Sequence, residues 1–490
     1  MKLYKLTAHS IRDGVAKGEF SSEDVTKSYL QRISLYNEKL NAFITINERA
    51  IDEAKNIDRL RKSGKPLGKL AGVPVAVKDM LCTEGLKTTA ASKILGNFVP
   101  PYSSTVVERL KAAGAIVVGK ANCDEFAMGS SNETSAFGQC LNPWNMDYVP
   151  GGSSGGSACA IAGQMSAIAI GTDTGGSIRQ PANFTGIVGI KPTYGRVSRY
   201  GIVAFASSLD QAGPMTRTVK DAALTLEVIS GFDPKDSTSS TQPVPNWSES
   251  ISTNLKGLVV GIPKEYVSGN LHPDVKKSLE ETIDLLKSEG VKFVEVTLPT
   301  SRFAVAIYYL VCASEASSNL ARYDGVRYGY RYQDQSGKMN LETLYAESRG
   351  RGFGSEVKRR IMIGTYALSS GYYDAYYKKA CQVRGVLKQE FVTALSKCNM
   401  ILSPVTTSPA FKVGERINDP LTMYMNDLYT ISANLAGIPG MSVPVGFSKS
   451  GLPIGMQLMA KPFDEQVLFN VGEAIEQKSR NKKEYPDVIQ

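Results

Sequence analysis

Short apolar stretches alternate with amphipathic helices in two parts of the chain. TVVERLKAAG (105–114) has the spacing of an amphipathic helix that ends at Gly114, and AIVVG follows it as a short buried strand. LVVGIP (258–263), PDVKKSLEETIDLLKSEG (273–290) and VKFVEVTLP (291–299) have the patterns of a strand, a helix and a strand. This alternation predicts an α/β fold in which helices cover a parallel or mixed sheet.

The length of 490 residues allows roughly two to four ordinary domains or one large α/β domain. We expect residues 1–60 to form an N-terminal helical segment, in which Ser21 caps a helix with Asp24 three residues on. Residues 61–490 are expected to form one α/β domain. Within it, the Pro-, Ser- and Thr-rich stretch 233–250 is predicted to be a polar surface loop, and 303–395 a helical region rich in tyrosine.

Charge and cysteine usage narrow the class of protein. The formal net charge is +9, but no dense Lys/Arg cluster accompanies it, so a nucleic-acid surface stays an open alternative. The N-terminus lacks the apolar core of a secretory signal, and no run reaches the roughly 18 apolar residues of a membrane span. The seven scattered cysteines include no CxxC pair. We therefore expect a cytoplasmic protein with reduced thiols, no metal site and no membrane.

The segment PGGSSGGSACAIAGQMSAIAIGTDTGGSIRQP (150–181) contains two glycine- and serine-rich stretches separated by apolar residues. GTDTGGS (171–177) follows the predicted buried strand AIAI, and its glycines allow successive backbone N–H groups to turn toward one point. Such donors suit a developing oxyanion, with Ser177 beside them as a nucleophile. Asp173 can brace this turn, and Arg179 can pair with Asp173.

A serine nucleophile needs a base, and histidine is the usual one. The chain has two histidines, His9 and His272, and neither lies in a glycine-rich motif, which argues against a Ser-His-Asp triad. A buried, neutral lysine can replace histidine. Lys78, at the end of the apolar stretch LAGVPVAVK, fits that requirement, and GGSSGGS (151–157) can place a second serine between lysine and nucleophile.

Each of these features has a simpler interpretation. Lys78 can be a lysine that ends a strand and reaches solvent, and the glycine stretches can be turns beside strands. The same N–H donors can also hold a phosphate, which would make the chain a nucleotide-binding module. Against that alternative, the sequence has no GxxxxGK[ST] motif.

Lys78, GGSSGGS and GTDTGGSIRQPANFTGIVGIKPTYGRVSR together closely resemble the amidase signature family, whose signature corresponds to about residues 70–215 here. The resemblance implies a single large domain with a mixed, twisted central β-sheet covered by helices on both faces. It implies a Ser–cis-Ser–Lys triad with Ser177 as the acyl nucleophile, Ser153 as the bridging serine after a cis peptide bond and Lys78 as the base. The oxyanion hole would use the N–H groups of Thr174, Gly175, Gly176 and Ser177.

Other segments resemble the A-subunit family of the aspartyl/glutamyl-tRNA amidotransferases. They are SRYGIVAFASSLDQAGPMTR, ASEASSNLARYDGVRYGYR, VKRRIMIGTYALSSGYYDAYYKKA and MYMNDLYTISANLAGIPGMSVPVG. The resemblance implies hydrolysis of L-glutamine and passage of the ammonia to a partner B subunit. That partner would use ATP and Mg²⁺ to amidate Glu-tRNA(Gln) or Asp-tRNA(Asn), with a small C subunit completing a heterotrimer. No cofactor is expected in this chain itself.

Glutamine recognition calls for an arginine at the α-carboxylate and a carboxylate at the α-ammonium group. The resemblance assigns these roles to Arg360 and Asp427, with a hydrogen bond from Tyr308. Because Arg359 and Tyr309 are adjacent, each of the two assignments can be off by one residue. Alternatively, Arg360 is a solvated helix residue and Asp427 a helix cap. A free-standing amidase for another small amide is the alternative function, and it would not need Arg360 with Asp427.

Overall fold

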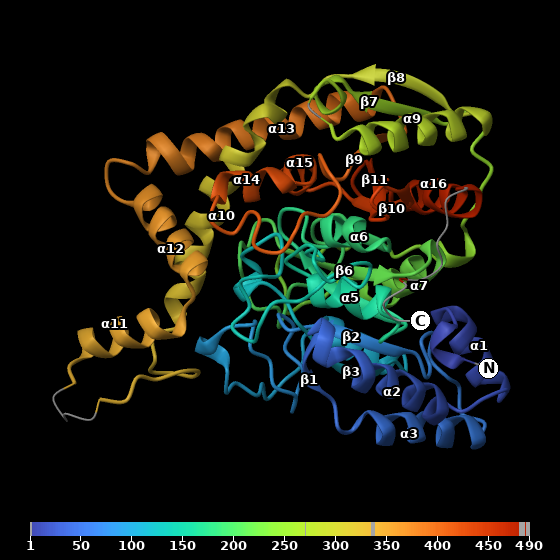
Figure 1. Cartoon of the computed structure of the whole chain (residues 1–490), viewed down its shortest axis with the longest axis horizontal. Helices are drawn as coiled ribbons and strands as arrows, with labels where there is room; N and C mark the ends of the chain where they lie inside the picture. Colours follow the sequence, from blue (N-terminus) through green and yellow to red (C-terminus); the bar gives the residue numbers. More distant parts are fainter. Residues whose placement is uncertain (1, 270, 335–338, 480–485, 487–490) are drawn as a thin grey trace.

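A computed structural model describes residues 2–269, 271–334, 339–479 and 486. The described residues form one sheet of eleven strands in the order β1-β3-β2-β4-β6-β5-β10-β11-β9-β7-β8. It runs from β8 at the top of Figure 1 to β1 near the bottom. The strands are β1 (Phe43–Ile46), β2 (Pro74–Lys78), β3 (Ile116–Ala121), β4 (Ile168–Asp173), β5 (Val188–Lys191), β6 (Gln211–Thr216), β7 (Val259–Pro263), β8 (Lys292–Val296), β9 (Met400–Pro404), β10 (Gly440–Phe447) and β11 (Pro453–Ala460).

The sheet is mixed, as the sequence predicts. β2 is parallel to β3 and β4, and β7 is parallel to β8 and β9. The strands between these two parallel groups pair antiparallel, and so does the edge strand β1 with β3. Every residue of β2, β3 and β4 is buried, since helices cover both faces there. Such two-sided cover explains why these strands have apolar runs in place of alternation.

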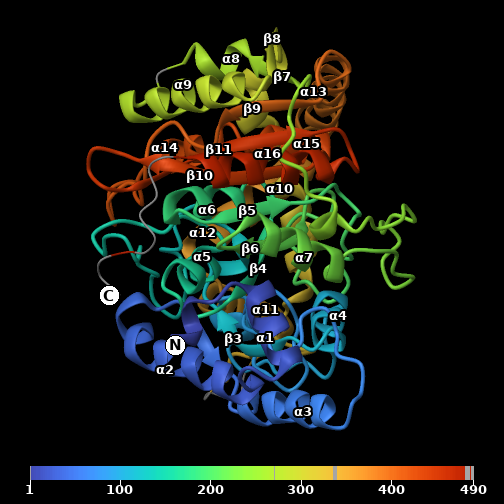
Figure 2. The ribbon, with the colours of Figure 1, turned by 90° about the vertical axis from the view of Figure 1, so that its right-hand side faces the viewer.

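The α-helices surround the sheet (Figures 1 and 2). They are α1 (Ala8–Lys17), α2 (Ser22–Leu40), α3 (Ala50–Lys62), α4 (Thr105–Ala112), α5 (Gly155–Ala162), α6 (Arg179–Thr185), α7 (Val219–Ile229), α8 (Lys264–Val267), α9 (Pro273–Ser288), α10 (Ala304–Asn319), α11 (Leu341–Gly352), α12 (Ser355–Leu368), α13 (Lys379–Ser396), α14 (Pro420–Tyr424), α15 (Ile431–Ala436) and α16 (Glu465–Lys478). Among the described helices, none combines the length and apolar character that a membrane crossing requires.

Shorter helical turns lie between these elements. They are η1 (Leu3–Lys5), η2 (Lys93–Leu95), η3 (Glu125–Ala127), η4 (Trp247–Glu249), η5 (Pro299–Phe303), η6 (Leu320–Arg322), the π-helical η7 (Asp374–Lys378) and η8 (Met425–Asp427). Two of them, η3 and η8, adjoin or belong to segments that line the candidate active site described below.

The units expected from the strand–helix–strand pattern are present. α4 and β3 occupy the first predicted unit, and β7, α9 and β8 the second. Pro273 stands in the first turn of α9, where its missing N–H costs nothing, and Ser21 caps α2 by accepting a hydrogen bond from Asp24 N (2.9 Å). These local signals appear in the structure because each depends on residues close together in the chain.

One expectation about organisation needs correction. The first sixty residues are not only helical: Phe43–Ile46 forms β1 and pairs with β3 at the sheet edge. The chain stretch FITI favours a strand because its β-branched side chains fit a pleated surface. Residues of α1 and α2 also belong to the same hydrophobic core as the rest of the chain. The division at residue 60 stays a prediction.

The stretch 233–250 is largely exposed and irregular, as predicted, but it is anchored to the core at one residue. Trp247 within it is fully buried, and its ring packs against Phe469 with the centroids 5.9 Å apart. The helical region 303–395 is as predicted at α10 to α13, apart from the irregular stretch 323–334. In Figure 1 the helices α11 and α12 stand away from the sheet on the left.

Candidate active site

Lys78 ends β2 and is completely buried. Its Nζ lies 2.8 Å from Ser153 Oγ, 2.9 Å from Ser154 Oγ and 2.9 Å from Thr172 Oγ1. Burial lowers the pKa of Lys78 to about 8, because the charged form loses its hydration, although nearby acidic groups oppose the shift. Lys78 is therefore not a strand end that reaches solvent, and a large part of it is neutral near pH 8. Sequence reasoning missed Ser154 and Thr172, although each lies within one of the two glycine- and serine-rich stretches.

Ser153 lies in the turn that precedes α5. The Gly152–Ser153 peptide bond is cis, as expected for a bridging serine of this family. The Ser153 carbonyl accepts a hydrogen bond from Asp124 N (3.2 Å), which ties the turn to the segment before η3. Ser153 is fully buried, and its hydroxyl faces Lys78.

Ser177 lies in the second glycine turn, between β4 and α6, and is 8% exposed. Its carbonyl accepts a hydrogen bond from Ser154 N (3.2 Å), so the two glycine turns are joined directly. Between these described residues, no hydrogen bond links the Ser153 and Ser177 hydroxyls. The structure thus joins Lys78 to Ser153 through their side chains and brings Ser177 beside them through the backbone.

Three of the four predicted oxyanion donors are available. Within the described residues, the N–H groups of Thr174, Gly175 and Ser177 have no protein acceptor. The N–H of Gly176 donates instead to Asp173 Oδ1 (2.8 Å). Gly176 adopts φ +139°, and a Cβ there would lie 2.2 Å from Thr430 Oγ1, so both conformation and space require glycine.

Asp173 and Arg179 form the predicted pair and are both fully buried. Arg179 reaches both carboxylate oxygens of Asp173, each at 3.0 Å. Burial raises the pKa of Asp173, but the Arg179 guanidinium more than offsets this, and the pKa falls to about 2. The ionised carboxylate also accepts the N–H groups of Gly176 and Ile178, which braces the turn that carries Ser177.

The structure separates the two candidate arginines of α12. Arg360 is 3% exposed and donates through Nε to Glu356 Oε1 (2.8 Å), and its guanidinium lies 5.1 Å from the centre of the Tyr309 ring. The Arg359 side chain is 45% exposed and pairs with the other Glu356 oxygen. A solvated role therefore fits Arg359, and Arg360 is the one that turns inward.

Asp427 ends η8 and is buried with one oxygen unpaired. Its Oδ2 accepts a hydrogen bond from Ser130 Oγ (2.5 Å), whereas its Oδ1 has no partner in the described structure. Burial raises the pKa of Asp427 to about 7, and Asp173 adds to the shift, while Arg360 is close enough to oppose it. A buried carboxylate oxygen without a partner calls for a ligand with a donor group.

Tyr308 and Tyr309 both lie near this region. A Cβ on Gly175 would be 2.7 Å from the Tyr308 ring, so Tyr308 packs directly on the second glycine turn. Tyr309 instead stacks on Tyr424, with the ring centres 3.7 Å apart. Tyr308 is therefore the one placed beside the predicted oxyanion donors.

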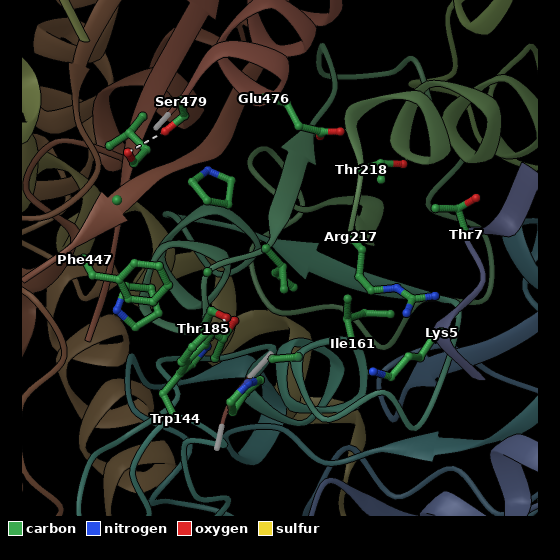
Figure 3. Close-up of a pocket in the computed structure, with 18 residues that line it drawn as sticks. Lys5, Thr7, Trp144, Ile161, Thr185, Arg217, Thr218, Phe447, Glu476 and Ser479 are labelled. Atoms are coloured by element: carbon green, nitrogen blue, oxygen red, sulfur yellow. Dashed lines mark hydrogen bonds between the residues drawn. The ribbon is translucent and has the colours of Figure 1, made fainter. Parts of the chain in front are cut away.

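A separate pocket near the chain termini contains none of the predicted residues (Figure 3). Two of its polar side chains bond to backbone carbonyls: Trp144 Nε1 donates to Thr185 O (2.7 Å), and Ser479 Oγ donates to Val445 O (2.8 Å). In the described part of the chain, no group of three or more His, Cys, Asp or Glu side chains could hold a metal ion.

Known proteins resemble the chain over its whole length. A sequence model of the family described as Amidase matches residues 24–469. The chain is 58% identical to the A subunit of glutamyl-tRNA(Gln) amidotransferase from Bdellovibrio bacteriovorus over 490 residues, 100% of each chain. It is 53% identical to the protein with the same name from Zymomonas mobilis over 484 residues, 98% of each chain.

Solved structures agree in fold. The crystal structure of the A subunit of glutamyl-tRNA(Gln) amidotransferase from Thermotoga maritima has a TM-score of 0.83 and 41% identity, covering 100% of this chain and 99% of that one. The native peptide amidase from Stenotrophomonas maltophilia has a TM-score of 0.83 and 29% identity, covering 99% of both chains. Both likenesses extend over the whole fold.

Proposed function

This chain belongs to the amidase family and, within it, to the A subunits of glutamyl-tRNA(Gln) amidotransferase, and from that premise we propose that it hydrolyses L-glutamine to supply ammonia. The ammonia would convert Glu-tRNA(Gln) to Gln-tRNA(Gln), and Asp-tRNA(Asn) to Asn-tRNA(Asn) where that substrate is present. The observation that carries the proposal is the fully buried Lys78, 2.8 Å from Ser153, beside the turn of Ser177.

In the proposed reaction the neutral Lys78 amine takes the proton of Ser153, and Ser153 takes that of Ser177. The Ser177 Oγ then attacks the side-chain amide carbon of glutamine. As the carbon–nitrogen bond breaks, Lys78 returns the proton through Ser153 to the leaving nitrogen, which departs as ammonia. Water next attacks the γ-glutamyl ester on Ser177 with Lys78 again as base, and glutamate is released. This route requires the Ser177 hydroxyl to come within hydrogen-bond reach of Ser153, and catalytic hydrogen bonds are often long without substrate.

The amide oxygen becomes negatively charged during the attack. The N–H groups of Thr174, Gly175 and Ser177 support stabilisation of that charge, because they have no acceptor of their own in the described structure. Asp173 holds the turn in this shape through Gly176 N and Ile178 N. Removing one such donor in other enzymes costs about 100-fold or more in rate.

Two buried charges support glutamine as the substrate. The unpaired Oδ1 of Asp427 is suited to the α-ammonium group, and Arg360 to the α-carboxylate. Tyr308, on α10, packs on Gly175 beside the oxyanion donors. A free-standing amidase remains the second candidate, favoured by the 29% identity to a peptide amidase, but such an enzyme has no need of both charges.

By this proposal the ammonia passes to a B subunit that uses ATP and Mg²⁺ to activate the tRNA-bound carboxylate, with a C subunit completing a heterotrimer. The misacylated tRNA is bound mainly by the partner. We place the complex in the cytoplasm, where all seven cysteines would stay as the free thiols that the structure shows.

The test is ammonia release from L-glutamine by the chain purified with its co-purifying partners. We expect release by the wild type, a loss of at least about 1,000-fold in Ser177→Ala, and an increase when Glu-tRNA and ATP are added. Ser442→Ala is the matched control, since Ser442 is also fully buried but its hydroxyl has no partner in the described structure.

Two results would contradict the proposal. Unchanged release from glutamine in Ser177→Ala would remove Ser177 from the chemistry. Ser177-dependent release from another amide, with none from glutamine, would identify a free-standing amidase.

A further inference from the structure

The Gln180 side chain holds the turn of Ser153 from one side. Gln180 lies in α6 and is fully buried. Its Oε1 accepts the N–H of Gly152 (3.0 Å), the residue directly before Ser153. Its Nε2 donates to the Ser130 carbonyl (2.9 Å). One side-chain amide therefore connects the turn that carries Ser153 to the loop that carries Ser130.

Ser130 in turn contacts Asp427, the carboxylate proposed above to bind the substrate ammonium group. Its Oγ donates to Asp427 Oδ2 (2.5 Å), although the two residues are 297 positions apart in the chain. The other oxygen, Oδ1, is buried and unpaired in the described structure. A continuous set of contacts thus runs from the unpaired oxygen of Asp427 through Ser130 and Gln180 to Gly152.

The segments along this route are closely packed. A Cβ on Gly151 would lie 2.4 Å from Gln180 Oε1, and a Cβ on Gly152 would lie 2.8 Å from Ser131 N. α5 and α6, which follow the two glycine turns, lie side by side at the centre of the molecule (Figures 1 and 2). In such a close-packed interior, a small displacement at one segment is felt by its neighbour.

We propose that Ser130 and Gln180 are positioning residues that couple binding of the substrate α-ammonium group at Asp427 to the placement of Ser153. The proposal rests on the glutaminase function proposed above. It makes glutamine a better substrate in the chemical step, as well as in binding, than an amide of the same length without that group.

The coupling has a direct electrostatic basis. Since burial brings the pKa of Asp427 to about 7, this carboxyl is partly protonated at neutral pH before substrate binds. An ammonium group at Oδ1 favours the ionised form, which accepts a stronger hydrogen bond from Ser130 Oγ. A firmly held Ser130 presents its carbonyl to Gln180 Nε2, and the Gln180 amide then holds Gly152 and Ser153 in the geometry that faces Lys78.

The experiment compares L-glutamine with glutaramate, which is glutamine without the α-amino group. We expect Gln180→Leu to lower kcat for glutamine about tenfold, the effect of one net hydrogen bond, and to leave kcat for glutaramate nearly unchanged. In Gln180→Leu, KM should still be lower for glutamine than for glutaramate, because Asp427 itself is intact. A purely structural role of Gln180 would lower kcat for both substrates by the same factor.

Asn183→Leu is the matched control on the same helix. Asn183 is also a buried amide, and it donates to Thr406 Oγ1 (2.9 Å) and accepts from Gly455 N (2.5 Å), outside the route to Asp427. Its substitution should leave the ratio of the two kcat values as in the wild type.

Ser130→Ala is the smaller change and keeps the test decisive if Gln180→Leu does not fold. Ser130→Ala should cause the same loss of the kcat preference for glutamine over glutaramate, and Ser130→Thr should restore most of that preference. The double variant Ser130→Ala/Gln180→Leu should lose no more of this preference than either single variant. Equal losses of kcat for both substrates in Ser130→Ala would overturn the coupling alone. Absence of glutamine hydrolysis by the wild type would overturn the proposed function and the coupling with it.

Discussion

Raising the pH from 7 to 9 is expected to increase kcat for glutamine about tenfold and then to approach a plateau. The reaction needs Lys78 neutral, and burial brings the pKa of this amine to about 8. With that value about a tenth of the lysine is neutral at pH 7 and about nine tenths at pH 9. A lysine with the ordinary pKa of about 10.5 would instead give a rise of about 100-fold with no plateau.

The assay is initial ammonia release at saturating glutamine, where protonation of Asp427 in the free enzyme no longer affects the rate. A second buried lysine could imitate the profile, because burial lowers the pKa of Lys191 to about 7. Lys191 Nζ donates to its neighbour's carbonyl at Pro192 (2.8 Å), on a different strand from Lys78. Lys191→Met should therefore leave the midpoint near pH 8.

Three results would refute this reasoning. A kcat independent of pH between 6.5 and 9 would mean that no titrating base limits the reaction. A rise of about 100-fold without a plateau would mean that Lys78 is not desolvated as the structure indicates. A midpoint that disappears in Lys191→Met would assign the titration to the other lysine.

Two further substitutions test the rest of the site. Arg360→Met should raise KM for glutamine about 100-fold through loss of a charged hydrogen-bond donor, whereas Arg359→Met, on the exposed side of α12, should leave KM unchanged in the same kinetic assay. An equal effect of both would contradict the assignment. Arg179→Met should lower the free energy of unfolding by about 3 kcal/mol, because it leaves the Asp173 carboxylate buried without its partner. Urea denaturation measures this, with the exposed Arg327→Met as a control expected to show no change; stability equal to the wild type in Arg179→Met would refute the pairing argument.

Much of the fold was predictable from the sequence because its signals are local. Three such signals depend on residues close together in the chain: the cap at Ser21, Pro273 in the first turn of α9, and the apolar runs of β2 and β4. Trp247 marks the limit of such signals. It lies in a polar stretch, but its ring is buried against Phe469, and only the return of α16 to this face provides that partner.

The candidate site was predictable in chemistry and only partly in geometry. Resemblance to a family assigned Lys78, Ser153 and Ser177, and the structure joins the turns of the two serines and brings Lys78, at the end of β2, to Ser153. The spacing of the motif did not predict which N–H groups are free to act as oxyanion donors. The N–H of Gly176 is not, because it donates to Asp173 across the turn. Arg359 and Arg360 are equivalent in sequence, and the packing of one face of α12 against α10 decides which of them is buried.

The sequence by itself determined the kinds of group available: a lysine after an apolar strand, glycines that permit tight turns, and serines within those turns. Only the tertiary structure decided the protonation and the hydrogen-bond partners of the groups in the site. The lowered pKa of Lys78 comes from the loss of water on every side, and the position of Asp427, with one oxygen paired and one unpaired, comes from the placement of Ser130, 297 residues away. Desolvation and long-range hydrogen bonds depend on everything that surrounds a group, and those surroundings exist only once the chain has folded.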